Sequence, residues 1–205
     1  MKPEQAAQPL LNWRTIVLLV VALACSALAI LWLGMYSDID LRLADAVFDR
    51  SRRTFPLRDA WLPNTFNHGV LKVFFTVLGG GVITAALADL RRPIRTFDGP
   101  ARLRLRIVGL SAGLVPLVTS LLKQASNSHC PWDLARYGGA QPYVRLLESL
   151  PFGADAGHCL PAGHASTSLW LAALAVFWLP GNPRRAAAVA AAGLAVGFAM
   201  GWGQQ

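Results

Sequence analysis

Residues 15–36 read TIVLLVVALACSALAILWLGMY, a run without a single charged side chain. A bilayer core about 30 Å thick is crossed by about 20 residues of α-helix, so this run is long enough to span a membrane. It is too long for the apolar part of a cleaved signal peptide. We therefore interpret it as a retained signal anchor.

Four more apolar runs follow, at 69–88, 106–122, 166–180 and 186–202. Across the 205 residues, 54% are hydrophobic and 15% are charged, and the mean hydropathy is +0.42. A soluble domain of this length is less apolar. We predict an all-α fold, a polytopic integral membrane helical bundle with five transmembrane helices, forming a single membrane domain over residues 1–205.

The formal net charge of +8 comes mostly from arginines that lie between the apolar runs. Residues 91–106 hold six arginines and one acid, and GNPRR at 181–185 holds two more. The positive-inside rule places both loops in the cytoplasm together with the N-terminus, and the loops 37–68 and 124–165 outside. This distribution is a topology signal, and we expect no nucleic-acid partner.

Two local patterns predict further structure. Leu43, Val47 and Phe48 recur at helical spacing in the loop 37–68, which fits either a short helix on the membrane surface or a solvated loop. In the last run, glycines repeat every four residues, at Gly193, Gly197 and Gly201. Such a face lets membrane helices approach closely, although an Ala/Gly-rich span without a special contact would show it too.

The outer loop 124–165, called the site loop below, is the longest connection and holds three of the four histidines. A long loop held by two helices is where a site is commonly built. Lys123 stands at its start, where its ammonium group either reaches the membrane surface or binds a ligand.

His164 closes the same loop, just before the fourth apolar run. Gly163 permits a tight turn there, and Ser166 or Thr167 could cap the helix. A helix N-terminus suits a phosphate group, and histidine exchanges protons near neutral pH. His164 is thus either a proton donor to a leaving group or a polar residue that starts a helix.

Cys130 and Cys159 also lie in this loop, each directly after a histidine. These two cysteines could be free thiols, zinc ligands or partners in a disulfide. Adjacent His and Cys do not match the usual spacing of zinc ligands, so we expect no metal. In an oxidising compartment, a disulfide would tie the segment after Lys123 to the segment before His164.

Two motifs in this loop resemble those of the type 2 phosphatidic acid phosphatases, Lys-x6-Arg-Pro and Pro-Ser-Gly-His. KQASNSHCP supplies Lys123 and Pro131 at the family spacing, with Cys130 in place of the arginine. PAGH supplies Pro161, Gly163 and His164, with Ala162 in place of the serine.

The resemblance implies a membrane enzyme that removes phosphate from lipid phosphates or lipid pyrophosphates by histidine-based phosphoryl transfer, without a cofactor. By position, Lys123 and the backbone of Ala162 and Gly163 would bind the phosphate, and His164 would act as general acid. Arg136 is our candidate for the missing arginine, against a structural or surface role. Asp133 would orient one of these cations or serve as an ordinary loop acid.

The third family motif, Ser-Arg-x5-His-x3-Asp, is missing, and it carries the histidine nucleophile. The resemblance implies six helices in the complete fold, so we expect the natural protein to continue beyond Gln205. We expect the 205 residues to turn over lipid phosphate poorly or not at all.

The resemblance places the protein in a cell inner or plasma membrane, with the site loop outside. The alternatives are a lipid phosphotransferase of the same fold, a non-catalytic protein that binds an anionic lipid, and a small transporter subunit. The near absence of ionisable groups in the spans argues against transport. The sequence assigns neither the lipid nor an oligomeric state.

Overall fold

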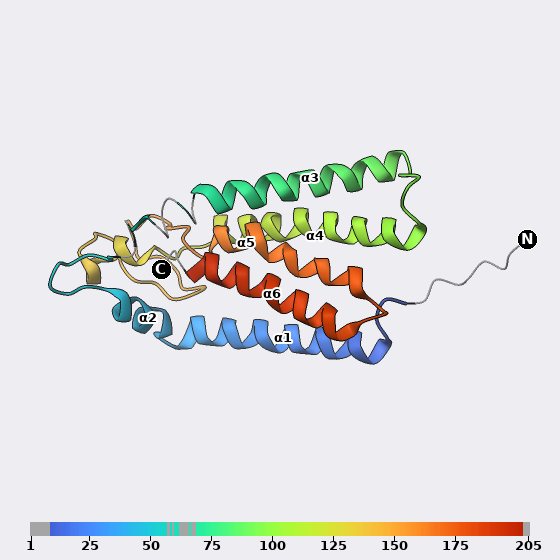
Figure 1. Ribbon diagram of the computed structural model, residues 1–205. Helices are drawn as coiled ribbons and strands as arrows, with labels where there is room; N and C mark the ends of the chain where they lie inside the picture. The colour runs from blue at the N-terminus through green and yellow to red at the C-terminus, as the bar shows by residue number, and fades with distance from the viewer. Residues whose placement is uncertain (1–8, 57, 59, 62–65, 67–68, 203–205) are drawn as a thin grey trace, which may run out of the picture.

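The computed structural model describes residues 9–56, 58, 60–61, 66 and 69–202, and all regular elements in this part are helices. The α-helices are α1 (Trp13–Tyr36), α2 (Ile39–Val47), α3 (Lys72–Arg91), α4 (Gly99–Gln124), α5 (Gly163–Leu169) and α6 (Pro183–Trp202). The described residues also form three 3-10 helices, η2 (Pro131–Asp133), η3 (Ala135–Tyr137) and η4 (Trp170–Trp178). The long helices run side by side along one axis (Figure 1). The predicted all-α class is confirmed.

In the described part of the chain, four helical segments are long and apolar enough to cross a membrane, Trp13–Tyr36, Gly69–Arg91, Gly99–Gln124 and Pro183–Trp202. They indicate a multi-pass membrane protein. The predicted span at 166–180 corresponds to α5 and η4, which form one continuous helix over 163–178. Its second half tightens to 3-10 geometry, and it is shorter than the four long segments. The predicted count of five spans is therefore not confirmed.

The start of α4 shows where the sequence pattern failed. We predicted a loop up to residue 106, but the helix already begins at Gly99. The side chain of Asp98 accepts a hydrogen bond from the Ala101 N–H at 2.7 Å, and Pro100 lies in the first turn. An Asp cap, an early proline and arginines, which favour helix, together start the helix before its apolar part.

Two of the arginines in this region form a buried ion cluster. Asp89 of α3 is fully buried, and it accepts from Arg102 Nε at 2.8 Å and from Arg106 Nη2 at 2.7 Å. The Ile94 N–H also donates to Asp89, at 3.0 Å. A buried carboxylate is costly without such partners, so this cluster fixes α3 against α4. We call the end of the bundle with residues 92–98 and 179–182 the arginine end.

The opposite end, where α4 ends and α5 begins, is called the site end below. The helices that meet there are packed through glycines. A Cβ on Gly193 would stand 2.5 Å from the backbone nitrogen of Ala172, and one on Gly201 would stand 3.1 Å from the Ala165 Cβ. The small-residue face of α6 thus lies directly on the α5–η4 helix, which confirms the close approach predicted from the glycine spacing.

The first helices pack differently from the others. None of the residues of α1 is buried, and near its site end the Leu146 N–H donates to the Gly34 carbonyl at 3.0 Å. The segment 39–47 is a helix rather than a solvated loop, and its buried Ala44 belongs to a cluster with Leu134 and Tyr137 of the site loop. The predictions for the two chain ends concern residues 1–8 and 203–205, which lie outside the described residues.

Candidate active site

Lys123 lies in the last turn of α4, at the site end. Its Nζ atom is 4.0 Å from the point where a Cβ on Gly163 would stand. Gly163 is the first residue of α5, so the ammonium group faces the start of that helix. Forty residues of chain separate the two positions, and the fold brings them together.

The start of α5 has no side-chain cap. Ala162 occupies the cap position, and its methyl group cannot accept a hydrogen bond from the first turn. The hydroxyls proposed as caps turn back into the helix instead, because Ser166 donates to the Gly163 carbonyl at 2.6 Å and Thr167 to the His164 carbonyl at 2.7 Å. The first backbone N–H groups therefore receive no hydroxyl acceptor from these residues.

His164 is the second residue of α5. Its side chain is partly exposed as a whole, but both ring nitrogens are buried. The next turn is buried too, since Ser166 is 3% exposed and Ser168 is completely covered. The imidazole thus sits at the boundary between the packed helix bundle and the site loop.

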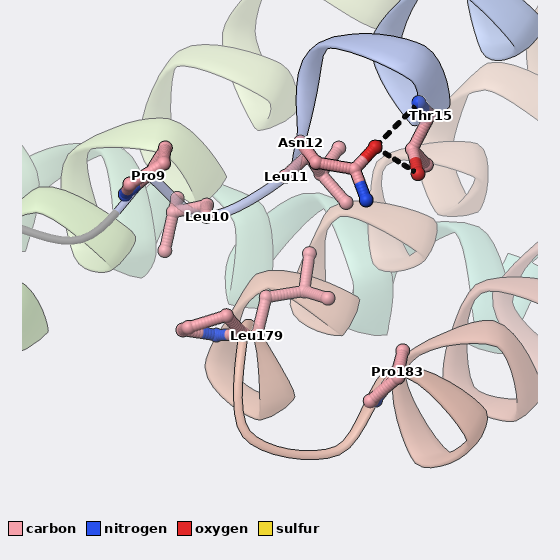
Figure 2. A pocket seen from close by; sticks show the side chains of 8 residues that line it. Pro9, Leu10, Leu11, Asn12, Thr15, Leu179 and Pro183 are labelled. Carbon is pink, nitrogen blue, oxygen red and sulfur yellow. Dashed lines mark hydrogen bonds between the residues drawn. The ribbon is translucent and has the colours of Figure 1, made fainter.

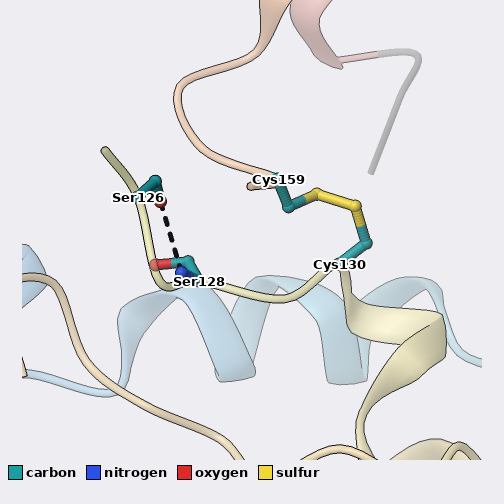
Figure 3. The surroundings of a disulfide bond; sticks show 4 residues. All are labelled: Ser126, Ser128, Cys130 and Cys159. Atoms are coloured by element: carbon teal, nitrogen blue, oxygen red, sulfur yellow. Dashed lines mark hydrogen bonds between the residues drawn. A yellow bond between two sulfur atoms is a disulfide. The ribbon is translucent and has the colours of Figure 1, made fainter. Parts of the chain in front are cut away.

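A disulfide joins Cys130 to Cys159, with their Cα atoms 5.2 Å apart (Figure 3). Beside the disulfide, the two segments of the loop are hydrogen-bonded to each other, because the Cys159 N–H donates to the Ser128 carbonyl at 2.8 Å. A Cβ on Gly157 would collide with the backbone of Ser128 and His129, so only glycine fits this crossing. The disulfide holds the segment that follows Lys123 against the segment that leads into α5.

The histidine before each cysteine has a separate contact. A ring nitrogen of His129 lies 2.8 Å from the Asp155 carbonyl, and one of His158 lies 3.3 Å from the Lys123 carbonyl. His158 also adopts a left-handed backbone, with φ of 51°, which histidine tolerates better than most residues. These contacts fix the loop around Lys123.

Arg136 forms an ion pair with a partner on α2. Its Nε and Nη2 donate to the two carboxylate oxygens of Asp45, at 3.1 and 2.6 Å. The hydrogen bonds from Arg136 lower the pKa of Asp45, and Asp45 in turn raises the pKa of Arg136. This two-point ion pair is the structural role that the sequence left open for Arg136.

The same carboxylate accepts from the buried Tyr137, at 3.0 Å, and burial together with this bond raises the Tyr137 pKa to about 12. A second link holds α2 to the loop, because Arg145 donates to Asp38 at 2.8 Å. Sequence analysis missed these contacts, since 92 residues separate Asp45 from Tyr137 and no local pattern connects them. Asp133 contributes backbone here, where its carbonyl accepts from the Gln141 N–H at 2.8 Å.

Comparison with known families finds a match over the second half of the chain. Residues 104–204, about half of the chain, match the model of the PAP2 superfamily. The matched region begins within α4 and contains Lys123, the disulfide loop and His164. No curated protein and no solved structure matches the chain.

Proposed function

Because this chain belongs to the PAP2 superfamily through residues 104–204, which indicates phosphatase-type activity, we propose that it carries the phosphate-binding and proton-donating part of a membrane lipid-phosphate phosphatase. The observation that carries the proposal is the position of Lys123 Nζ, against Gly163 and one residue from His164. The Lys123 ammonium group then faces the start of α5, and His164 is the next residue of that helix.

The phosphate of the substrate would lie between Lys123 and the start of α5. An ammonium group gives a charge-assisted hydrogen bond to a phosphate oxygen, and N–H groups at a helix start add a partial positive charge. Ala162 and Gly163 contribute only backbone to this cradle. Cys130 is bound in the disulfide and Arg136 is paired with Asp45, so Lys123 supplies the formal charge.

His164 would donate a proton to the oxygen of the leaving lipid alcohol or lipid phosphate. Its burial excludes bulk water from the ring nitrogens, and a positioned general acid contributes about 10²–10⁴-fold to such a step. The attacking histidine implied by the family pattern is not one of the chain's four histidines, which are His68, His129, His158 and His164. We therefore expect this chain to bind phosphate and to turn over lipid phosphate only slowly.

The proposed arrangement in the membrane makes the α5–η4 helix a fifth span. Seven α-helical residues and nine 3-10 residues rise by roughly 28 Å, close to the roughly 30 Å of the hydrocarbon core. The site end would face outward from an inner or plasma membrane, and the arginine end would face the cytoplasm.

A second candidate is a non-catalytic protein that binds the headgroup of an anionic lipid. Ala162 in place of the family serine and Cys130 in place of the family arginine favour it, because both changes remove ligands for a transition state while leaving Lys123. The two candidates share the phosphate site and differ in turnover.

Binding and turnover can be measured separately on the purified protein in detergent. We expect calorimetry with orthovanadate to show binding that falls at least about tenfold, about 1.4 kcal/mol, in Lys123→Ala. Lys72→Ala is the matched control, because Lys72 is also partly buried at the site end, at the start of α3. Equal affinity in the parent and Lys123→Ala would overturn the site.

Release of phosphate from a short-chain phosphatidate then separates the two candidates. Turnover that disappears in His164→Ala, with vanadate binding kept, supports the phosphatase. Vanadate binding without turnover in the parent supports the non-catalytic protein. Turnover that is unchanged in His164→Ala would exclude the proposed general acid.

A further inference from the structure

A cavity of about 360 Å³ lies at the arginine end, between the start of α1 and the turn from η4 to α6 (Figure 2). Leu10 and Leu11 line one side, and Leu179 and Pro183 line the other. Among the described lining residues, the polar side chains are those of Asn12 and Thr15, and they are hydrogen-bonded to each other at 2.8 Å. The cavity therefore offers an apolar surface to whatever fills it.

The cavity separates α1 from the rest of the bundle. All other long helices contain buried residues, whereas α1 contains none. Near the site end α1 is held by the bond between Leu146 and Gly34, and at the arginine end the cavity intervenes between α1 and the turn at 179–183. An apolar molecule in the cavity would complete the packing of this end.

Several arginines are neighbours in the chain of residues that line the cavity. Arg14 precedes Thr15 in the chain, and Arg184 and Arg185 follow Pro183 directly, with all three arginines exposed. Arg104 reaches the lining itself, because its Nη2 donates to the Leu179 carbonyl at 2.8 Å. The buried Nε of Arg104 has no hydrogen-bond partner within the described part of the chain.

Among the described residues, the acids of this end are engaged elsewhere. Asp89 is occupied by Arg102 and Arg106, and the Asp98 carboxylate caps α4. None of the described residues that line the cavity is an acid. An excess of arginine beside an apolar cavity fits a ligand with an anionic head and an apolar tail.

Aromatic side chains indicate how deep the cavity lies in the membrane. Trp13 at the start of α1 is 75% exposed, and Trp178 at the end of η4 is 36% exposed. Exposed tryptophans are typical of the boundary between lipid headgroups and hydrocarbon. The arginines beside the cavity then stand at headgroup height, where each basic residue attracts anionic lipid.

We propose that this cavity binds one anionic phospholipid of the surrounding leaflet. An acyl chain lies along Leu11 and Leu179, and the headgroup phosphate is bound by Arg184 and Arg185. The lipid fixes α1 to the α5–η4–α6 part of the bundle. The site is at the opposite end from Lys123 and His164, so it stands or falls independently of the proposed phosphatase reaction.

Native mass spectrometry of the full chain in detergent tests the proposal, with phosphatidylglycerol and phosphatidylcholine of identical acyl chains added in turn. We expect the parent to retain one phosphatidylglycerol and to prefer it over phosphatidylcholine. In R184Q/R185Q this preference should fall on the order of tenfold, as expected for the loss of two headgroup contacts. Thr15→Trp, which fills the cavity, should lower the binding of both lipids.

The matched control is R91Q/R92Q, which removes the same charge from exposed arginines at the same end but away from the cavity. It should keep the preference for phosphatidylglycerol. An equal loss in R91Q/R92Q and R184Q/R185Q would show a diffuse basic surface and overturn the site. Equal binding of the two lipids by the parent would overturn the role of the arginines.

Discussion

Lys123 of α4 and Gly163 of α5 face each other so closely that a methyl group on Gly163 would stand 4.0 Å from the Lys123 ammonium nitrogen. That distance is an ordinary contact, so Gly163→Ala should fold. The new methyl group would occupy space beside the ammonium group, where the phosphate is proposed to lie.

Stability and binding should consequently change in opposite directions in Gly163→Ala. Alanine favours helix over glycine by about 1 kcal/mol, so the unfolding temperature should stay level or rise. Affinity for orthovanadate should fall by about tenfold. Calorimetry and thermal unfolding in the same detergent measure the two effects, and unchanged affinity would place the phosphate elsewhere.

The pair of Asp45 and Tyr137 predicts how the loop responds to alkaline pH. Burial and the Asp45 carboxylate raise the Tyr137 pKa to about 12, from about 10 in an unfolded chain. A raised tyrosine pKa favours the neutral form in the folded state. Its contribution to stability is complete below pH 10 and is lost as the pH rises through 12.

Asp45→Asn removes the negative charge and should shift the Tyr137 titration toward pH 10. Difference absorbance at 295 nm between the variant and the parent would isolate Tyr137 from the other tyrosines. Tyr137→Phe, which has no ionisable hydroxyl, supplies the control and should abolish the difference. A titration that Asp45→Asn leaves unchanged would contradict the coupling.

Gly193 tests the packing of α6 on the α5–η4 helix. A Cβ there would stand 2.5 Å from the Ala172 nitrogen and 2.8 Å from the Leu171 carbonyl carbon, and neither backbone atom can move alone. Gly193→Ala should therefore destabilise the protein by roughly 1–3 kcal/mol. Gly80→Ala in α3, where nothing lies within 4 Å, should be neutral or stabilising in the same thermal unfolding assay.

The glycine spacing predicted the packing of α6 correctly, whereas hydropathy predicted the start of α4 wrongly, and both outcomes depend on whether the deciding contacts are local in sequence. The close packing at Gly193 and Gly201 could be predicted because residues four apart lie on one helix face, so the glycine repeat is visible within a short stretch of sequence. The start of α4 depends on the Asp98 cap and on the burial of Arg102 and Arg106 against Asp89, which hydropathy does not record. A polar residue with a buried partner looks like a loop residue in the sequence.

Some residues of the candidate site could likewise be predicted from local motifs, whereas contacts between distant segments could not. Lys123 and His164 could be selected because each belongs to a short spaced motif at a helix end. The partner of Arg136 could not, because Asp45 lies 91 residues away and only the folded chain brings α2 to the site loop. Contacts between distant segments decide whether an arginine is available to a ligand.

Labelling of single cysteines tests the proposed orientation. Ser149 and Thr96 are exposed, at the site end and the arginine end respectively. In a Cys25→Ser background, a membrane-impermeant maleimide added to intact cells should label Ser149→Cys and leave Thr96→Cys unlabelled until the cells are permeabilised. The reverse pattern would invert the topology.

The disulfide between Cys130 and Cys159 adds one covalent link to the hydrogen bonds and ion pairs that hold the site loop. Closing a loop of 29 residues by a disulfide stabilises a folded state by about 3–4 kcal/mol in the chain-entropy treatment. In the double variant with serine at both positions, protease should cut between residues 146 and 156 much faster than in the parent. The helices should remain intact, because the packing of α3, α4 and α6 does not involve this loop.

The same variant tests whether the disulfide positions Lys123. If the bond holds the lysine against Gly163, the double serine variant should bind orthovanadate several-fold more weakly at an unchanged helix content by circular dichroism. Parent protein treated with reductant should behave in the same way. Unchanged vanadate affinity in both samples would mean that the ends of α4 and α5 are held together by helix packing alone.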